Sequence, residues 1–162
     1  MLLRWSRLLQ LQLNSPVLVP GSKAPEFLAS SAHGKKEFLN YADVQLPTVL
    51  YVFTPDCHWC ARNLENIKHL AGVTSSKFRF VGVALSDKDL DSYLMNSNLP
   101  FHVYRTLSDD VKIAYSLNST PTTIVISPEG KVLQYWRGAY SGTMKNEVEQ
   151  FFQLTLPGIG MD

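Results

Sequence analysis

The sequence has 162 residues, of which 45% are hydrophobic and 18% are charged. That length allows one well-buried core and is too short for two ordinary domains. The 15 basic and 14 acidic residues give a formal net charge of +1, so no overall field attracts nucleic acid or an anionic membrane surface.

The first twenty residues are interpreted as a leader or stalk ahead of the folded domain. Arg4 and Arg7 precede an apolar run over residues 8–13, but glutamines interrupt the run and no small-residue cleavage site follows. The run is also too short and too polar to span a bilayer. A membrane tether is therefore expected only if the natural protein has a longer N-terminus.

The domain is expected over residues 21–156, with a short C-terminal tail over residues 157–162. Its opening segment, Gly21 to Phe27, is punctuated by glycine and proline, and Pro25 favours an extended path. The apolar runs and periodicities that follow predict these elements in order: a hairpin turn at 32–35 and a strand over 36–39, a strand over 48–53, a helix from 57 to about 70, a strand over 77–85, a helix from 87 to about 96, a strand over 102–105, a helix over about 109–115, strands over 122–126 and 132–136, and a helix from about 144 to 152.

Strand, helix and strand follow one another over residues 48–85, which predicts a right-handed crossover between two parallel strands. The remaining strands are expected to run antiparallel. The sequence thus predicts an α/β fold with a central mixed sheet and helices on both faces. Two boundaries depend on single residues: Gly72 is expected to end the first helix, and Asp87 is expected to cap the second.

The two cysteines of the chain, Cys57 and Cys60, stand together where the first helix begins. At that spacing their Cβ atoms lie about 5–6 Å apart and can be drawn into a disulfide. Cys57 is expected to be the more exposed and more acidic nucleophile, because unsatisfied N–H groups and the helix dipole favour its thiolate. Cys60, one turn inside the helix, is expected to be buried and to resolve the mixed disulfide.

No metal site is expected on this pair, because the histidines of the chain do not stand at a finger-like spacing from it. No other cofactor is expected. The pair follows a buried strand within a strand–helix–strand pattern, which is the context that a redox motif of this type requires. Thr120 and Pro121 open a later strand, where a turn of the backbone could face the cysteines.

The segment from Gly21 to about Leu154 resembles the thioredoxin-like proteins of the TlpA/ResA group, which are often membrane-tethered and extracytoplasmic. The matches are the Gly-x-x-Ala-Pro-x-Phe opening at residues 21–27, the turn at Gly34-Lys35, the apolar strand that runs into Cys57-His58-Trp59-Cys60, and the run over 120–126 with its hairpin at 128–131.

The resemblance implies a thioredoxin fold with an N-terminal strand extension. It implies that Pro121 follows a cis peptide bond and lies against the redox cysteines, and that Thr120 offers its backbone to the substrate. It also implies work in the periplasm or cell envelope. The protein is expected to be a monomer that exchanges disulfides with protein thiols or disulfides and depends on an upstream redox partner.

Several positions depart from the family pattern. Family members carry a tryptophan-rich segment before the first cysteine and often a proline or small residue before the second, where this chain has Thr54-Pro55-Asp56 and Trp59. Tyr51 matches the position of a buried aspartate in thioredoxin, and Asn63 matches a glutamate of the respiratory subgroup. The direction of electron flow therefore does not follow from the resemblance.

His58 and Trp59 are candidate substrate-binding residues between the cysteines. His58 is expected to be exposed; its protonated form would stabilise the Cys57 thiolate, whereas Asp56 would oppose it. The indole of Trp59 either lines a substrate groove or covers the start of the helix.

Two other functions remain open at this stage. Thr54 precedes Cys57 by three residues, which resembles the Thr-Pro-x-Cys segment of peroxiredoxins and would make Cys57 a peroxide-reducing thiol. The proline that those enzymes place four residues before the threonine is Leu50 here. Alternatively, Cys57, Cys60 and His58 form a copper(I)- or zinc-binding module, since thiolates are soft ligands.

Overall fold

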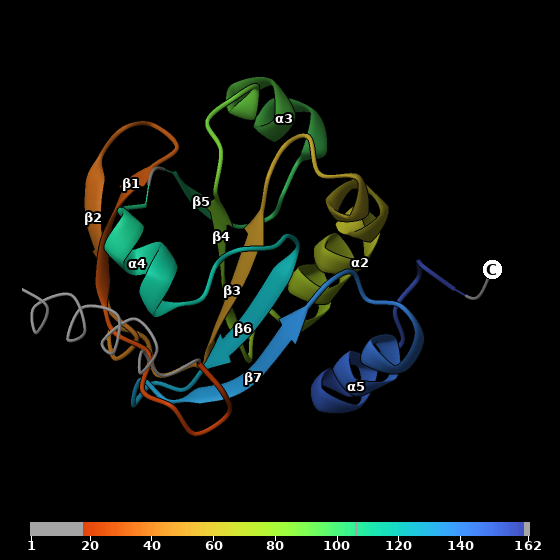
Figure 1. Ribbon diagram of the computed structural model, residues 1–162. Coiled ribbons are helices and arrows are strands. Elements are labelled where there is room, and N and C mark those ends of the chain that lie inside the picture. Colours follow the sequence, from red (N-terminus) through yellow and green to blue (C-terminus); the bar gives the residue numbers. More distant parts are fainter. Residues whose placement is uncertain (1–17, 106, 161–162) are drawn as a thin grey trace, which may run out of the picture.

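The computed structural model describes residues 18–105 and 107–160, and the predicted leader falls almost wholly outside them (Figure 1). The elements along the chain are β1 (Phe27–Ser31), β2 (Lys36–Leu39), β3 (Thr48–Phe53), α2 (His58–Thr74), β4 (Arg79–Ala84), α3 (Leu90–Ser97), β5 (His102–Arg105), α4 (Asp109–Ala114), β6 (Thr122–Ile126), β7 (Val132–Arg137) and α5 (Gly142–Phe152).

The described strands form one seven-stranded sheet in the order β2-β1-β5-β4-β3-β6-β7. β3 pairs parallel with β4 and antiparallel with β6, which confirms the predicted mixed sheet. β5 runs parallel to β4, so the expectation that every later strand is antiparallel was wrong. The reason is that α3 forms a second crossover, which returns the chain to the end of the sheet at which β4 begins. β5 therefore runs in the same direction as β4.

Alternate residues of β3 point into two different apolar layers, as expected for a strand with both faces buried. Val49, Tyr51 and Phe53 pack with residues of α2, α3 and α5. Leu50 and Val52 pack on the other face, beneath α4 and the residues next to the β1–β2 hairpin. Helices therefore lie on both faces of the sheet, as the sequence predicts (Figure 1).

α2 continues through Gly72 and ends only after Thr74, so the expected stop at the glycine was wrong. A glycine inside a helix costs about 1 kcal/mol relative to alanine. That cost is exceeded here because the turn around it buries Leu70 and Thr74, at 0% and 5% exposure. The Thr74 hydroxyl also donates to the Leu70 carbonyl at 2.7 Å, and Ser75 is the C-cap.

The expected cap at Asp87 is also corrected. α3 begins at Leu90, and its N-cap residue is Asp89 in the left-handed region, with no side-chain cap. The Asp87 carboxylate instead lies 3.6 Å from the guanidinium of Arg105. Its carbonyl accepts the N–H of Leu90 at 3.2 Å, in a turn that precedes the helix.

Candidate active site

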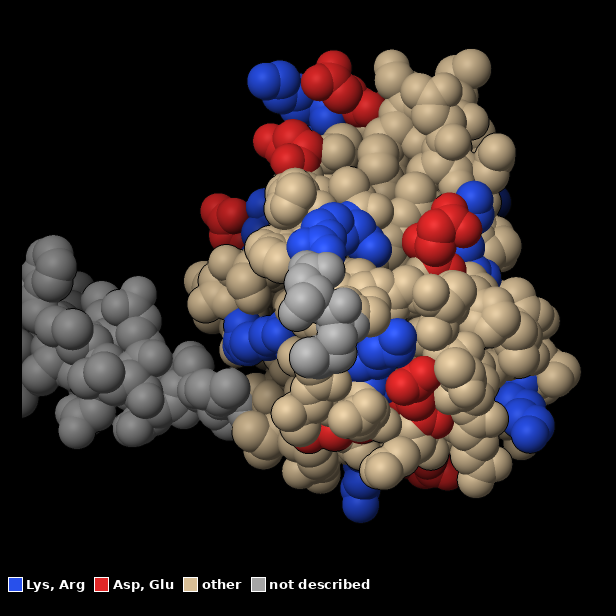
Figure 2. Space-filling view, turned by 90° about the vertical axis from the view of Figure 1, so that its right-hand side faces the viewer, with Lys and Arg blue, Asp and Glu red and all other residues tan. Residues whose placement is uncertain are grey.

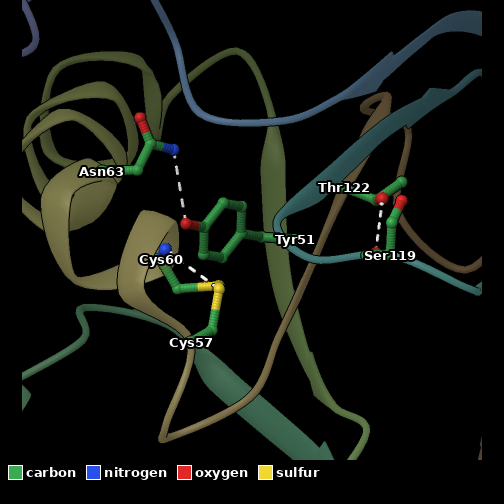
Figure 3. The surroundings of a disulfide bond; sticks show 6 residues. All are labelled: Tyr51, Cys57, Cys60, Asn63, Ser119 and Thr122. Carbon is green, nitrogen blue, oxygen red and sulfur yellow. Dashed lines mark hydrogen bonds between the residues drawn. A yellow bond between two sulfur atoms is a disulfide. The ribbon is translucent and has the colours of Figure 1, made fainter.

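A short turn carries the chain from the buried end of β3 to Cys57 at the start of α2. The N–H of Cys57 donates to the Thr54 carbonyl at 3.3 Å, which closes this turn. Cys57 is the N-cap of the helix, and its Sγ accepts the backbone N–H of Cys60 at 3.1 Å. The two cysteines form a disulfide, which Figure 3 draws. Their Cα atoms lie 5.1 Å apart.

The two sulfur-bearing residues differ in exposure. Cys60 is 1% exposed and packs in the apolar layer under α2, whereas Cys57 is partly exposed. The predicted difference in exposure is therefore confirmed. An attacking group can reach Cys57 from solvent, and Cys57 is the cysteine that lies at the positive end of the helix dipole.

Trp59 and His58 both lie on the surface beside the disulfide. Trp59 is 48% exposed, and the guanidinium carbon of Arg62 lies 5.0 Å from the centroid of its ring. The rings of His58 and Trp59 meet edge to face at 5.5 Å. The indole thus leaves a large apolar surface open to solvent next to Cys57.

Thr120 and Pro121 lie at the end of the sheet where α2 begins. The ladder between β3 and β6 ends with Val52 opposite Thr122, so continuing this register brings Thr54 opposite Thr120. The Thr120–Pro121 peptide bond is cis, the conformation that the family resemblance implies. Contact between Pro121 and the sulfur atoms stays a prediction.

The backbone of Thr120 differs from that of its neighbours, which is hydrogen-bonded. Within the described part of the chain, no hydrogen bond involves its N–H or its carbonyl. The Ser119 carbonyl accepts the Thr122 hydroxyl at 2.9 Å (Figure 3), and the Pro121 carbonyl accepts the N–H of Gly138 at 2.8 Å. Thr120 is half-buried, so part of the residue is open to solvent.

A buried polar cluster lies behind Cys60, and the sequence reasoning missed its connections. Figure 3 shows Tyr51 pointing from β3 toward α2, where Asn63 donates to its hydroxyl at 3.3 Å. The carbonyl oxygen of Asn63 accepts the N–H of Tyr140 at 2.9 Å and the amide of Asn66 at 3.2 Å. The hydroxyl of Tyr140 lies 2.7 Å from that of Thr123.

Asn66 extends this cluster to the C-terminal segment. Its side chain donates to the Gly158 carbonyl at 3.3 Å and accepts the Gly158 N–H at 2.8 Å. A usable signal was present in the sequence, because Asn63 and Asn66 stand three residues apart on the helix face that also carries Cys60 and Ile67. Their partners come from distant segments, which periodicity does not reveal.

The cluster is uncharged at neutral pH. Burial raises the pKa of Tyr51 and of Tyr140 well above the ordinary tyrosine value. The other members are amide and hydroxyl side chains, which do not ionise in this range. In the described residues, no group of three or more His, Cys, Asp or Glu side chains is placed to hold a metal ion.

Charge is dispersed over the face that Figure 2 shows, where basic and acidic side chains are interspersed among uncharged ones. Among the helices of the described residues, none combines the length and the apolar character needed to cross a membrane.

A family model described as a thioredoxin-like domain matches residues 35–152. The chain belongs to the thioredoxin-like family. The thiol-disulfide oxidoreductase ResA of Bacillus subtilis is 24% identical over 144 residues, which cover 85% of this chain and 76% of that relative.

Solved structures share the thioredoxin-like fold. The thioredoxin domain of a thiol-disulfide oxidoreductase from Bacteroides vulgatus superposes with a TM-score of 0.68 at 22% identity, covering 83% of this chain and 99% of that one. StoA from Bacillus subtilis superposes with a TM-score of 0.62 at 17% identity, and the match covers 82% of this chain and 99% of StoA. A secreted disulfide oxidoreductase of Mycobacterium tuberculosis superposes with a TM-score of 0.63 at 18% identity, and the match covers 78% of this chain and 94% of that one.

These findings confirm the predicted family and the predicted fold. The prediction of thiol–disulfide exchange is supported by the thioredoxin-like family, by the ResA relative and by the Cys57–Cys60 disulfide.

Proposed function

We propose that this thioredoxin-like protein exchanges disulfides with protein substrates, with Cys57 as the attacking thiol and Cys60 as the resolving thiol. The observation that carries the assignment is the asymmetry of the pair. The Sγ of Cys57 accepts a helix N–H at 3.1 Å and its residue is partly exposed, whereas Cys60 is 1% exposed. The bond from the Cys60 N–H stabilises negative charge on the Cys57 sulfur.

In the reducing direction, the Cys57 thiolate attacks one sulfur of a substrate disulfide. A Cys57–substrate disulfide forms, and the second substrate sulfur leaves as a thiolate that takes a proton from water. The Cys60 thiolate then attacks the Cys57 sulfur, restores the Cys57–Cys60 disulfide and releases the first substrate sulfur. Two electrons pass from the cysteine pair to the substrate, and an upstream dithiol partner must return them. The same steps in reverse oxidise a substrate dithiol.

We place substrate docking at Thr120, with Pro121, His58 and Trp59 beside it. An extended substrate segment can add to the unpaired N–H and carbonyl of Thr120 as a short strand, which supplies affinity without specifying side chains. The exposed indole of Trp59 offers apolar area for the side chains next to the substrate cysteine.

The domain bounds, the oligomeric state and the location are part of the same proposal. Residues 21–156 form the catalytic domain, which acts as a monomer, with residues 1–20 as leader or stalk and 157–162 as tail. An extracytoplasmic site of action is supported by the structural likeness to a secreted disulfide oxidoreductase. Such a compartment sustains the disulfide chemistry proposed here.

The test uses two variants with a protein disulfide substrate, insulin, and dithiothreitol as the recycling reductant. Cys57→Ser is expected to abolish catalysed reduction. Cys60→Ser, reduced first and then mixed with insulin after the dithiothreitol has been removed, is expected to accumulate a mixed disulfide on Cys57 that mass spectrometry locates. Wild-type protein without catalysed reduction, or Cys57→Ser with full activity, would overturn the assignment. Consumption of hydrogen peroxide by Cys57, or copper or zinc that co-purifies through Cys57 and Cys60, would favour the two other functions.

A further inference from the structure

The segment that presents Thr120 begins at a backbone conformation unusual for its residue. Ser116 follows α4 with φ of 54°, in the left-handed region where helices commonly place glycine. Its N–H donates to the Ile113 carbonyl at 3.0 Å, and the N–H of Leu117 donates to the Lys112 carbonyl at 2.8 Å. These two bonds end the helix, and the Ser116 carbonyl accepts the N–H of Asn118 at 3.1 Å.

Two side chains of β7 bind that carbonyl. The hydroxyl of Tyr135 donates to the carbonyls of Tyr115 and Ser116, at 2.7 and 3.2 Å. One terminal nitrogen of Arg137 donates to the Ser116 carbonyl at 3.2 Å and to the side-chain oxygen of Asn118 at 2.6 Å. The Arg137 guanidinium carbon also lies 4.9 Å from the centroid of the Tyr135 ring. The pair therefore holds residues 115–118 from one side.

The other end of the segment is held by the sheet. Arg137 stands opposite Thr122 in the ladder between β6 and β7, and the next residue of that strand, Gly138, bonds to the Pro121 carbonyl at 2.8 Å. Thr120 thus lies between two anchored stretches, and within residues 18–105 and 107–160 its own N–H and carbonyl have no partner. A loop held on both sides of one free residue is ordered in advance for docking, which lowers the entropy lost on binding.

We propose that Arg137 is a positioning residue for the substrate, which holds segment 116–120 so that Thr120 faces the Cys57 end of the sheet. This proposal rests on the proposed function, because it assigns a role in the docking step of that reaction. Arg137 is exposed on β7 and its bonds go to the loop. Arg137 therefore affects the binding of the substrate, and the cysteines alone carry out the disulfide exchange.

The experiment compares two disulfides that release the same thiol. One is an extended peptide of about ten residues whose single cysteine is joined to 2-mercaptoethanol, which is long enough to pair as a strand. The other is 2-hydroxyethyl disulfide, which has no peptide backbone. Single-turnover reduction by the reduced protein gives, for each probe, the half-saturating concentration and the maximal rate.

Arg137→Ala is expected to raise the half-saturating concentration for the peptide about tenfold, the scale of one pre-ordered segment made mobile. Its maximal rate with the peptide and its rate with 2-hydroxyethyl disulfide should stay within about twofold of wild type. Arg137→Lys keeps a charged donor but loses the planar guanidinium that lies over the Tyr135 ring, so its half-saturating concentration for the peptide should fall between those of wild type and Arg137→Ala. Lys131→Ala is the matched control, because it removes an exposed positive charge at the opposite end of the same hairpin.

The proposal is overturned if Arg137→Ala binds the peptide as well as wild type does, or if it slows both probes equally. An equal loss would mean that the arginine supports the whole site rather than the docking segment. Failure of the proposed function gives a different result, in which wild-type protein itself reduces neither probe. Should Arg137→Ala fail to fold, Asn118→Ala removes one of the same bonds and is held to the same two outcomes.

Discussion

The polar groups on the two sides of the disulfide differ in how completely they are hydrogen-bonded. Behind the disulfide lies the buried cluster around Asn63 and Asn66, and in front of it lies the backbone of Thr120. Behind it, the amide of Asn63 uses both its nitrogen and its oxygen, and Asn66 binds both backbone groups of Gly158. In front of it, neither backbone group of Thr120 has a hydrogen-bond partner among the residues that the structure describes. The helix that carries the cysteines is therefore fixed from behind, and the surface that faces a substrate keeps its bonding capacity.

This contrast separates two uses of polar groups at one site. A buried polar group without a partner costs about 1–3 kcal/mol, so the cluster behind Cys60 stabilises the fold only while every member is paired. A half-buried backbone group is hydrated at lower cost and can exchange water for a substrate strand. Removing bonds behind the disulfide should change stability, and changes in front of it should alter substrate exchange.

The largest effect is expected from Asn63→Ala. It leaves the Tyr51 hydroxyl, the Tyr140 N–H and the Asn66 amide without their partner in the core. The free energy of unfolding in urea should fall by about 3–5 kcal/mol. The control Asn146→Ala, at an exposed position of α5, should change it by less than about 0.5 kcal/mol. Equal midpoints for the two variants would contradict the role of the cluster.

The second effect concerns the two thiols of the reduced protein. Iodoacetamide should modify Cys57 at least about tenfold faster than Cys60, because Cys57 is partly exposed at the helix N-terminus and Cys60 is 1% exposed. Peptide mapping after brief labelling at several values between about pH 5 and pH 9 measures the ratio. Preferential labelling of Cys60 across that range would reverse the assigned roles.

Alkaline pH should weaken the cluster through its tyrosines. Burial raises the pKa of Tyr51 and Tyr140 in the folded protein, whereas both titrate near pH 10 when unfolded. The stability that they contribute is therefore complete below about pH 10 and is lost as the pH rises above it, by about 1.4 kcal/mol per pH unit for each group. Tyr51→Phe should reduce the loss of unfolding free energy per pH unit by the contribution of one group, about 1.4 kcal/mol. An unchanged dependence on pH would show that Tyr51 ionises freely in the folded protein.

A smaller effect is expected from Trp59→Ala. Loss of the exposed indole should reduce the rate with the peptide disulfide about threefold, and the free energy of unfolding should change by less than about 1 kcal/mol. Phe38→Ala is the control, since Phe38 is 57% exposed on β2, the edge strand at the other side of the sheet. If both variants slow the peptide equally, the indole has no special place in docking.

Local patterns in the sequence predicted the strands and the reactive pair. The strands at 36–39, 102–105 and 122–126 have their predicted bounds, because apolar and β-branched runs there end at turn residues. Cys60 is buried because it shares a helix face with Ile67 and Leu70, which the spacing already indicates.

What the sequence did not reveal depends on distant partners. Gly72 does not stop α2 because tertiary packing outweighs its helix propensity, and the direction of β5 depends on how α3 crosses the sheet. Tyr51 and Asn63 were recognised as departures from the family pattern, but only the fold shows that they bond to each other. The anchoring of Ser116 by Arg137 likewise joins segments that no periodicity connects.

Amide hydrogen exchange can compare Thr120 and Gly158 in one sample, using Cys60→Ser protein free and joined through Cys57 to the extended peptide. The Gly158 N–H, bound by Asn66 at 2.8 Å, should be protected in both states. The Thr120 N–H, which has no partner among the described residues, should exchange fast in the free protein and at least about tenfold more slowly in the complex. Equally fast exchange at Thr120 in both states, with the peptide attached at Cys57, would contradict substrate docking on its backbone.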